Sequence, residues 1–363
     1  MFQKIKLFKI LYTLISTIAT LNLLCSCTSN KYFEIQSNNI IYNGDTKFIN
    51  DIPDWYRYST NNLAKLCVSP DFTIIQKVAY VVSCNNELLH RSDVTNSQRL
   101  SAIDNYNLSV FNLLQFKLQN KAAKSLSIVL NSKNKSINLN HLTLTTNFEL
   151  LNKRLSFKEF GELGVVAISE AKNRKKGFDK FYPREGIFRS VNFTFNSLVL
   201  VEKQLIVTLN YEIVSEPIYT KLGTQTYLKK YSPSAAYLAL LEKADIDNFS
   251  LLGLIYATQA EFREGVFAIE PISLTKIPLI MTHGLNSDPL IWRYLTMTLL
   301  NDPDINKHFQ IWHFYYPSGP PPFFTAMKLR KKVEDLLALT SSNNLVNKAV
   351  FVGHSMGGSS LMS

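Results

Sequence analysis

The sequence predicts an α/β protein. A parallel sheet alternating with helices is expected over residues 262–363, after a mixed helical and β-rich region over residues 61–261. The first of these predictions depends on three short apolar runs, which are typical of strands buried on both faces of a parallel sheet. These runs are residues 277–282, 309–315 and 348–352. Helical patterns separate the runs, which is the order of a sheet with right-handed crossover connections. The two connecting helices are predicted over residues 288–300 and 323–339.

Residues 1–27 have the pattern of a targeting signal. Three lysines lie within the first nine residues, and the apolar stretch over residues 10–24 is too short and too poorly flanked for a lasting transmembrane helix. Cys27 follows a small serine and lies three residues after a leucine. This arrangement resembles the lipobox of bacterial lipoproteins, and the resemblance implies that Cys27 carries the acyl chains, palmitate among them. A plain secretory signal that is cut nearby is the alternative.

The lipobox resemblance also implies a location. Cys27 is followed by Thr28 and Ser29 and not by an aspartate. By resemblance to bacterial lipoproteins, this favours the outer membrane, with the protein facing the periplasm of the bacterial cell envelope. Several acyl chains anchor a protein stably to a membrane. The sequence therefore predicts a membrane partner that is reached through lipidated Cys27.

The region between the leader and residue 262 changes its pattern several times. Residues 28–60 are polar and rich in Asn, Tyr and Ser, so they are predicted to be a tether. Residues 61–120 show helical spacing, residues 125–230 alternate with a period of two, and residues 232–260 return to helical spacing. The clearest alternation is that of Val191, Phe193 and Phe195. No catalytic constellation is found in this region.

Two cysteines lie outside the leader, and three histidines stand apart from any motif. Cys67 and Cys84 either form one disulfide or remain two buried thiols, and the sequence leaves both alternatives open. His90, His141 and His308 are isolated and are expected to be surface or internally satisfied residues. No spacing of these residues predicts a metal site, and no motif predicts a cofactor.

A glycine-rich stretch follows the last of the three apolar runs. It reads Gly353-His354-Ser355-Met356-Gly357-Gly358. A Gly-x-Ser-x-Gly pattern after a buried strand is typical of a nucleophile elbow, a strained strand-to-helix turn that exposes the serine hydroxyl. Glycines are needed there because bulkier neighbours would collide. The alternative is a glycine-rich turn that arises by chance.

A second motif follows the first apolar run. Residues 277–282 lead into His283-Gly284-Leu285, and the glycine there permits a close approach of the backbone. An ordinary glycine turn between a strand and a helix is the alternative. Residues 277–363 together resemble the α/β-hydrolase superfamily, and most of all its lipase and esterase branch, which has a Gly-His-Ser-Met-Gly-Gly elbow.

The resemblance implies roles for these residues. Ser355 would be the nucleophile, and the backbone amides of Leu285 and Met356 would form the oxyanion hole. The family also needs an Asp or Glu and then a His after the nucleophile, yet the eight residues after Ser355 contain neither. We therefore expect this chain to be the front part of a longer hydrolase that is truncated after the elbow. We expect His283 to be structural, His354 to point away from the serine hydroxyl, and the chain as given to be inactive.

Two functions from different classes follow. The first is a serine hydrolase at the cell envelope that acts on carboxylic esters, with a lipid or other acyl compound as substrate. The second is a non-catalytic envelope lipoprotein or an inactive fragment.

The formal net charge is +11, or +8 without the three lysines of the leader. The positive residues are scattered, and Arg174-Lys175-Lys176 is their densest run. A nucleic-acid partner is not expected, because a solvated face or attraction to anionic lipid explains this charge.

Overall fold

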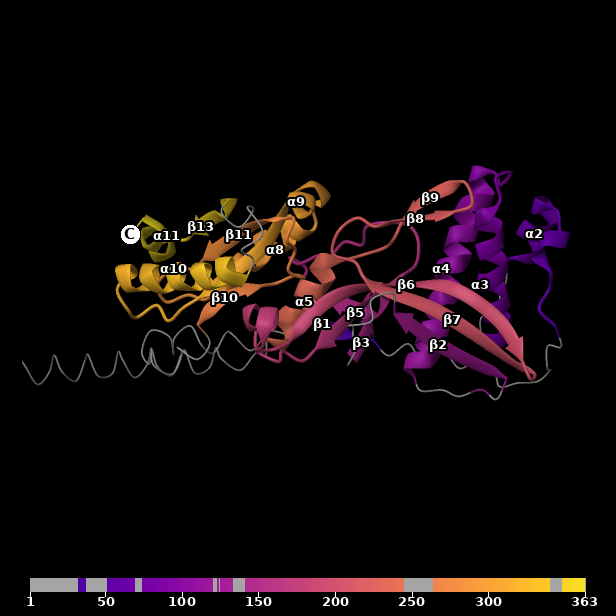
Figure 1. Ribbon diagram of the computed structural model, residues 1–363, viewed down its shortest axis with the longest axis horizontal. Helices are drawn as coiled ribbons and strands as arrows, with labels where there is room; N and C mark the ends of the chain where they lie inside the picture. Colours follow the sequence, from indigo (N-terminus) through magenta and orange to yellow (C-terminus); the bar gives the residue numbers. More distant parts are fainter. Residues whose placement is uncertain are drawn as a thin grey trace, which may run out of the picture.

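The protein is an elongated molecule with both helices and sheets (Figure 1). Helices α2 to α4 and a five-stranded sheet lie toward one end, α5 lies near the middle, and a four-stranded sheet with its helices lies at the other end. The mixed α/β class predicted from the sequence is confirmed at this level. The computed structural model describes residues 32–36, 51–68, 74–119, 123, 125–132, 141–244, 264–339 and 348–362.

The helical pattern over residues 61–120 corresponds to three helices, α2 (Thr60–Leu66), α3 (Ile75–His90) and α4 (Asn96–Leu118). Helix α4 begins with a capping box: the Thr95 hydroxyl accepts from the Gln98 amide at 3.3 Å, and the Gln98 side chain accepts from the Thr95 amide at 3.0 Å. The apolar faces of α3 and α4 pack against each other and against the five-stranded sheet. These helices therefore form one wall of a large hydrophobic core.

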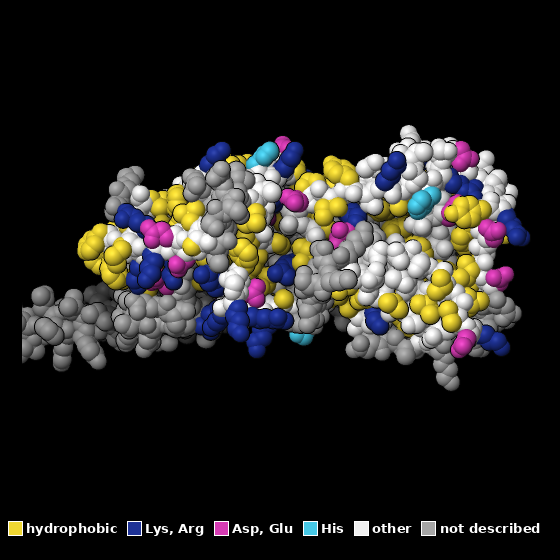
Figure 2. Space-filling view, in the orientation of Figure 1, with side chains coloured by type: hydrophobic (Ala, Val, Ile, Leu, Met, Phe, Trp, Pro, Cys, Tyr) yellow, Lys and Arg dark blue, Asp and Glu magenta, His cyan; other side chains and the backbone are white. Residues whose placement is uncertain are grey.

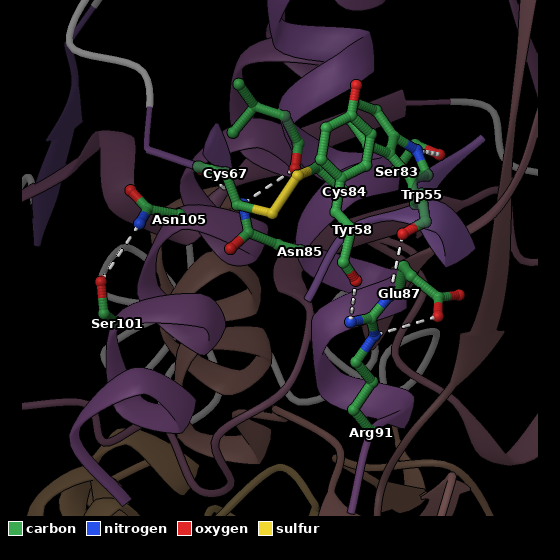
Figure 3. Close-up of a disulfide and its surroundings, with 11 residues drawn as sticks. Trp55, Tyr58, Cys67, Ser83, Cys84, Asn85, Glu87, Arg91, Ser101 and Asn105 are labelled. Atoms are coloured by element: carbon green, nitrogen blue, oxygen red, sulfur yellow. Dashed lines mark hydrogen bonds and ion pairs between the residues drawn. A yellow bond between two sulfur atoms is a disulfide. The ribbon is translucent and has the colours of Figure 1, made fainter. Parts of the chain in front are cut away.

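A disulfide joins Cys67, at the end of α2, to Cys84, within α3 (Figure 3). Both cysteines are buried, and their Cα atoms are 5.3 Å apart. Beside them, the Asn85 side chain donates to the Cys67 carbonyl at 2.9 Å. Of the two alternatives that the sequence leaves open, the structure thus contains the disulfide, which fixes the short helix α2 against α3.

The five-stranded sheet has the order β2-β7-β6-β5-β3. Its strands are β2 (Leu126–Ser132), β3 (His141–Leu144), β5 (Val165–Ala171), β6 (Ile187–Val201) and β7 (Gln204–Ile213). Strands β2 and β7 are parallel, and the other pairs are antiparallel, so the sheet is mixed. Its long strands β6 and β7 curve visibly (Figure 1). The sheet confirms the β-rich prediction, because Val191, Phe193 and Phe195 are buried on its helix-facing side.

Part of the segment predicted as a tether is folded. Strand β1 (Phe33–Ile35) pairs with β4 (Phe148–Leu150), and the rings of Phe33 and Phe148 stack at 4.3 Å. A single 3-10 turn, η1 (Trp55–Arg57), precedes α2. The tether prediction is therefore corrected for these residues: aromatic side chains in a polar segment supply enough apolar area to dock it onto the fold.

Four more short elements lie before α5 among the described residues. They are the 3-10 turns η2 (Thr145–Asn147) and η3 (Gly177–Phe181) and the hairpin strands β8 (Tyr219–Leu222) and β9 (Gln225–Leu228). Helix α5 (Pro233–Lys243) follows them and is capped by Ser232, whose hydroxyl accepts from the Ala235 amide at 3.3 Å. The helix predicted near residue 234 is therefore present.

The four-stranded sheet has the order β10-β12-β11-β13. Its strands are β10 (Gly265–Ala268), β11 (Ile277–Thr282), β12 (Phe309–Tyr315) and β13 (Val350–Gly353). Strand β11 is parallel to both β12 and β13, as the three apolar runs predict. Strand β10, which is antiparallel to β12, was not predicted.

Helices cover both faces of this sheet. Helix α10 (Pro322–Leu339) and the short helix α11 (Met356–Met362) share a hydrophobic cluster with one face. The 3-10 turn η5 (Pro289–Trp292) and helix α8 (Arg293–Leu300) lie on the other face, and α9 (Pro303–His308) precedes β12. The helix predicted over residues 288–300 begins as a 3-10 turn, which Asp288 caps: its carboxylate accepts from the Leu290 amide at 2.7 Å.

The two regions of the chain share a hydrophobic core. Ala235 and Leu238 of α5 belong to the same buried cluster as Met281 of β11 and Ile311 of β12. Helix α5 also packs against β5, β6 and α8. The position near residue 262, where the sequence pattern changes, is therefore no boundary of the hydrophobic core.

Candidate active site

The glycine-rich stretch forms a sharp turn between β13 and α11. Strand β13 ends at Gly353, helix α11 begins at Met356, and Ser355 lies between them with a φ of +54°. This left-handed conformation is uncommon for a residue with a side chain and costs about 1 kcal/mol or more. The Ser355 side chain is exposed. The turn therefore presents the serine hydroxyl to solvent at the carboxyl edge of the parallel strands.

Two glycines of the turn are required by the closeness of the surrounding backbone. A Cβ added at Gly353 would lie 2.5 Å from the Cα of Gly358. A Cβ added at Gly357 would lie 2.4 Å from the carbonyl oxygen of His283. Real Cβ atoms do not approach backbone so closely, which explains why this strand-to-helix turn has glycines at both places.

The loop after β11 lies directly beside this turn. Strands β11 and β13 are parallel neighbours in which Thr282 is paired with Gly353, so their ends meet at the same edge. The His354 amide donates to the Thr282 carbonyl at 3.0 Å. A Cβ added at Gly284 would lie 3.0 Å from the Cβ of Ser355. The structure therefore brings together the two motifs that are separated by about 70 positions in the sequence.

The amides predicted to form the oxyanion hole belong to these two adjoining segments. Leu285 lies in the loop after β11, and Met356 is the first residue of α11. Within the described part of the chain, neither backbone amide donates to another group. Unpaired amides are the kind of donor that an anionic oxygen requires.

His283 is held in place by both of its ring nitrogens. Its Nδ1 lies 3.0 Å from the Gly284 carbonyl, and its Nε2 accepts from the Tyr316 amide at 3.3 Å. The ring stacks on Tyr316 at 4.3 Å, and the Tyr316 hydroxyl donates to the His283 carbonyl at 2.6 Å. Burial lowers the pKa of His283 to about 4, against a weaker opposing effect of its hydrogen bonds. This neutral ring fixes the backbone of the loop.

The proline-rich segment after β12 adds a further support. The Ser318 hydroxyl accepts from the Asn286 amide at 3.0 Å, and Asn286 itself has a φ of +50°. Ser318 is buried although it lies in a loop. Reasoning from the sequence did not identify Ser318 or Tyr316 as supports. Their position just after a parallel strand, at the edge where such sheets bind ligands, was the signal that could have found them.

His354 belongs to the turn, and exposed apolar side chains lie on the loop after β11 and on α10, which packs against α11. His354 is exposed, and its ring contacts Trp292 edge-on, with centroids 6.3 Å apart. Leu285, Phe323 and Met327 are exposed apolar residues of the neighbouring loop and of α10. In the described ranges, no hydrogen bond joins the Ser355 hydroxyl to a histidine or a carboxylate. The nucleophile candidate therefore has no general base among these residues.

The remaining predicted sites lie elsewhere or outside the described residues. His90, His141 and His308 are exposed, and Cys27 precedes the first described residue. The described residues contain no group of three or more His, Cys, Asp or Glu side chains arranged to bind a metal ion. Within those residues, no helix has an apolar stretch long enough to cross a membrane.

Comparison of the chain with protein-family models, with curated proteins and with solved structures yields no match. The chemical interpretation of the turn at Ser355 therefore depends on its own geometry.

Proposed function

We propose that this chain is a serine hydrolase of the α/β-hydrolase type, with Ser355 as nucleophile and a carboxylic ester as substrate. The observation that carries the proposal is the left-handed Ser355, exposed at the junction of β13 and α11. The adjoining His283-Gly284-Leu285 loop supports it, because this loop leads out of the parallel strand next to β13. A strained serine at a strand-to-helix turn beside such a loop is the arrangement of a nucleophile elbow.

The reaction follows from this arrangement. The Ser355 oxygen attacks the ester carbonyl carbon while its proton passes to a base, and the carbonyl oxygen becomes an anion. The amides of Leu285 and Met356 would donate to that oxygen. Collapse of the intermediate breaks the bond to the alcohol, which leaves with a proton, and the acyl group stays on Ser355. Water then attacks the acyl group and releases the carboxylic acid.

We expect the general base to be a group outside the described residues. His283 is unsuited, since it is buried, both of its ring nitrogens are engaged, and its pKa is about 4. A base is most effective when its pKa lies near the working pH. Without a base the hydroxyl is a weak nucleophile, so we expect turnover several orders of magnitude below that of a complete triad.

The substrate is proposed to be a lipid or another acyl compound. Exposed apolar side chains on the loop after β11 and on α10, those of Leu285, Phe323 and Met327, suit an acyl chain. The proposed setting is the cell envelope, with the protein anchored through acylated Cys27 to the outer membrane and facing the periplasm. The Cys27→Ser variant should lose labelling by radioactive palmitate and should leave the membrane fraction. Palmitate labelling that persists in this variant would show that Cys27 is not the anchored residue.

A missing base can be replaced from solution, and this provides the test of activity. Added imidazole should raise the hydrolysis of p-nitrophenyl acetate by the purified chain, and Ser355→Ala should abolish the increase above the rate of imidazole alone. A fluorophosphonate probe should label the same serine under these conditions. His354→Ala is the matched control, because its exposed ring has no assigned chemical role. If imidazole gives no Ser355-dependent rate or labelling, the chain is a non-catalytic envelope lipoprotein or an inactive fragment.

A further inference from the structure

A cavity of about 340 Å³ lies on the opposite side of the four-stranded sheet from α10 and α11. Its walls come from α5, from β10, from the end of β12, from the start of η5 and from the segment that contains η3. None of its lining residues belongs to the turn at Ser355 or to the loop over residues 283–285. The volume falls in the range of small-molecule pockets, about 300–1,000 Å³. We call it the α5 cavity.

The interior of the α5 cavity is mainly apolar. Leu240, Leu241 and Ala244 line it from α5, and Phe267 and Ile269 line it from the side of the sheet. Leu240, Leu241, Ala244 and Ile269 are buried in the fold. An apolar wall favours a hydrocarbon chain, because burial removes the apolar surface of the ligand from water.

Two buried polar groups of the cavity wall carry no charge at neutral pH. His313 lines the wall, and its Nε2 lies 3.0 Å from the Thr296 hydroxyl. Burial lowers the pKa of His313 to about 3, so the ring is neutral. Tyr237, which meets His313 edge-on, is also buried in the wall. Neither group offers a charged partner, so we expect an anionic ligand group to stay beside the exposed cations of the lining.

The rim is basic. Residues 172–184 include six Lys or Arg residues and one acidic residue, Asp179. Figure 2 shows Lys and Arg side chains gathered along the lower edge of the molecule, below the positions of α5 and β10 in Figure 1. Of these cations, Lys175, Lys180 and Arg184 line the cavity. The cavity is thus apolar inside and positively charged at one side of its opening.

The two acidic residues of the cavity lining each have a cation partner. Glu185 lies 3.8 Å from Arg184, and Glu264 lies 2.7 Å from Lys328. No carboxylate of the described residues lies within 4.0 Å of the ammonium of Lys175 or Lys180. The Lys180 ammonium lies over the face of the Phe181 ring, 5.0 Å from its centroid. These two exposed lysines are available to an anion at the rim.

We propose that the α5 cavity binds an amphipathic anion with one alkyl chain, such as a long-chain carboxylate. The chain would enter between α5 and β10, and the anionic head would stay at the rim beside Lys175 and Lys180. The site is separate from Ser355, and the proposal does not depend on hydrolase activity. Ser355→Ala should therefore leave binding unchanged.

The probe is dodecanoate, kept below the concentration at which it forms micelles and titrated into the purified chain by calorimetry. We expect binding of one molecule, and decanoate should bind about 15-fold more weakly, since each methylene contributes about fourfold in affinity. Dodecyltrimethylammonium has the same chain but a cationic head and should not bind. Binding of the cation as tightly as dodecanoate, or no binding of dodecanoate, would overturn the proposal.

Two variants separate the rim from the interior. Lys175→Gln with Lys180→Gln should weaken dodecanoate binding about tenfold, because each exposed pair contributes up to about 1 kcal/mol. Lys203→Gln with Lys221→Gln is the matched control, since both are exposed lysines away from the cavity, and Lys203, like Lys175, has a positive φ.

Ala244→Phe places a ring inside the cavity and should abolish binding, while the melting temperature reports whether the variant folds. Dodecanoate affinity that is unchanged in a folded Ala244→Phe protein, or equal in the two lysine pairs, would refute the site. Affinity that appears only above the micelle concentration would also refute it. The lysine variants test the proposal even if Ala244→Phe does not fold.

Discussion

Two adjacent glycines of α11, Gly357 and Gly358, should respond to the same substitution in opposite ways. A Cβ at Gly357 would lie 2.4 Å from the His283 carbonyl oxygen and 2.5 Å from that of Thr282. Both are backbone atoms at the end of β11, so the methyl group can be accommodated only if the helix or the strand end moves. A Cβ at Gly358 would meet nothing closer than the Gly353 carbonyl oxygen, at 3.7 Å.

The expected changes in the free energy of unfolding follow from these distances. Overpacking against a rigid neighbour costs about 1–3 kcal/mol, and two contacts near 2.5 Å place Gly357→Ala at the upper end, about 3 kcal/mol. Gly358→Ala adds no clash and replaces a helical glycine, which stabilises a helix by up to about 1 kcal/mol. The free energies of unfolding of the two variants should therefore differ by about 3–4 kcal/mol.

Urea unfolding followed by tryptophan fluorescence measures this difference, with Trp292 close to the turn through His354. The midpoint of Gly357→Ala should fall below that of the parent protein, while that of Gly358→Ala should equal or exceed it. Equal midpoints for the two variants would mean that α11 does not cross the end of β11 as closely as the structure has it. The placement of the Met356 amide beside the 283–285 loop would then lose its support.

Two further predictions concern stability. Replacing Cys67 and Cys84 by alanine should lower the free energy of unfolding by about 3 kcal/mol, because the disulfide closes a loop of 17 residues. The loss measured against the oxidised parent protein should exceed the loss measured against the reduced parent, and equal losses would argue against this. His283 and His313 have folded-state pKa values of about 4 and about 3, below the ordinary 6.5, so the unfolded chain binds the protons first. Stability should therefore be full well above pH 6.5 and fall as the pH drops toward 4 for His283 and toward 3 for His313, by about 2 kcal/mol for each histidine between pH 7 and 5. His313→Gln should make unfolding midpoints less dependent on pH in this window, and an unchanged dependence would contradict the assignment.

The parallel part of the fold could be predicted because its strands are buried on both faces. Such strands are continuous apolar runs that stand out from their surroundings, as residues 277–282 and 309–315 do. Strand β10 (Gly265–Ala268) escaped prediction, since its four residues give no periodicity to read. The folded part of the predicted tether escaped for a related reason: its polar composition hides the few aromatic residues, such as Phe33, that dock it.

The candidate site was partly predictable for a different reason. The spacing of Gly353 and Gly357 around Ser355 is a local requirement of one turn, and local requirements are visible in the sequence. The support from Tyr316 and Ser318 depends on which strand lies next to which, and this is decided by the whole sheet. The shared core of α5 with β11 and β12 is likewise a long-range result that no window of the sequence contains.

The hydrophobic core that α5 shares with both regions has a consequence for how the protein unfolds. Because the side chains of α5 are packed against β5 and β6 and also against α8 and the parallel sheet, neither region can lose its packing while the other keeps it intact. Heat or denaturant should thus melt both sheets in one cooperative step, and amide hydrogens of β6 and β11 should exchange with similar opening free energies. A substitution that destabilises the protein near the disulfide would then also raise the fraction of molecules in which the serine turn, at the far end, is unfolded.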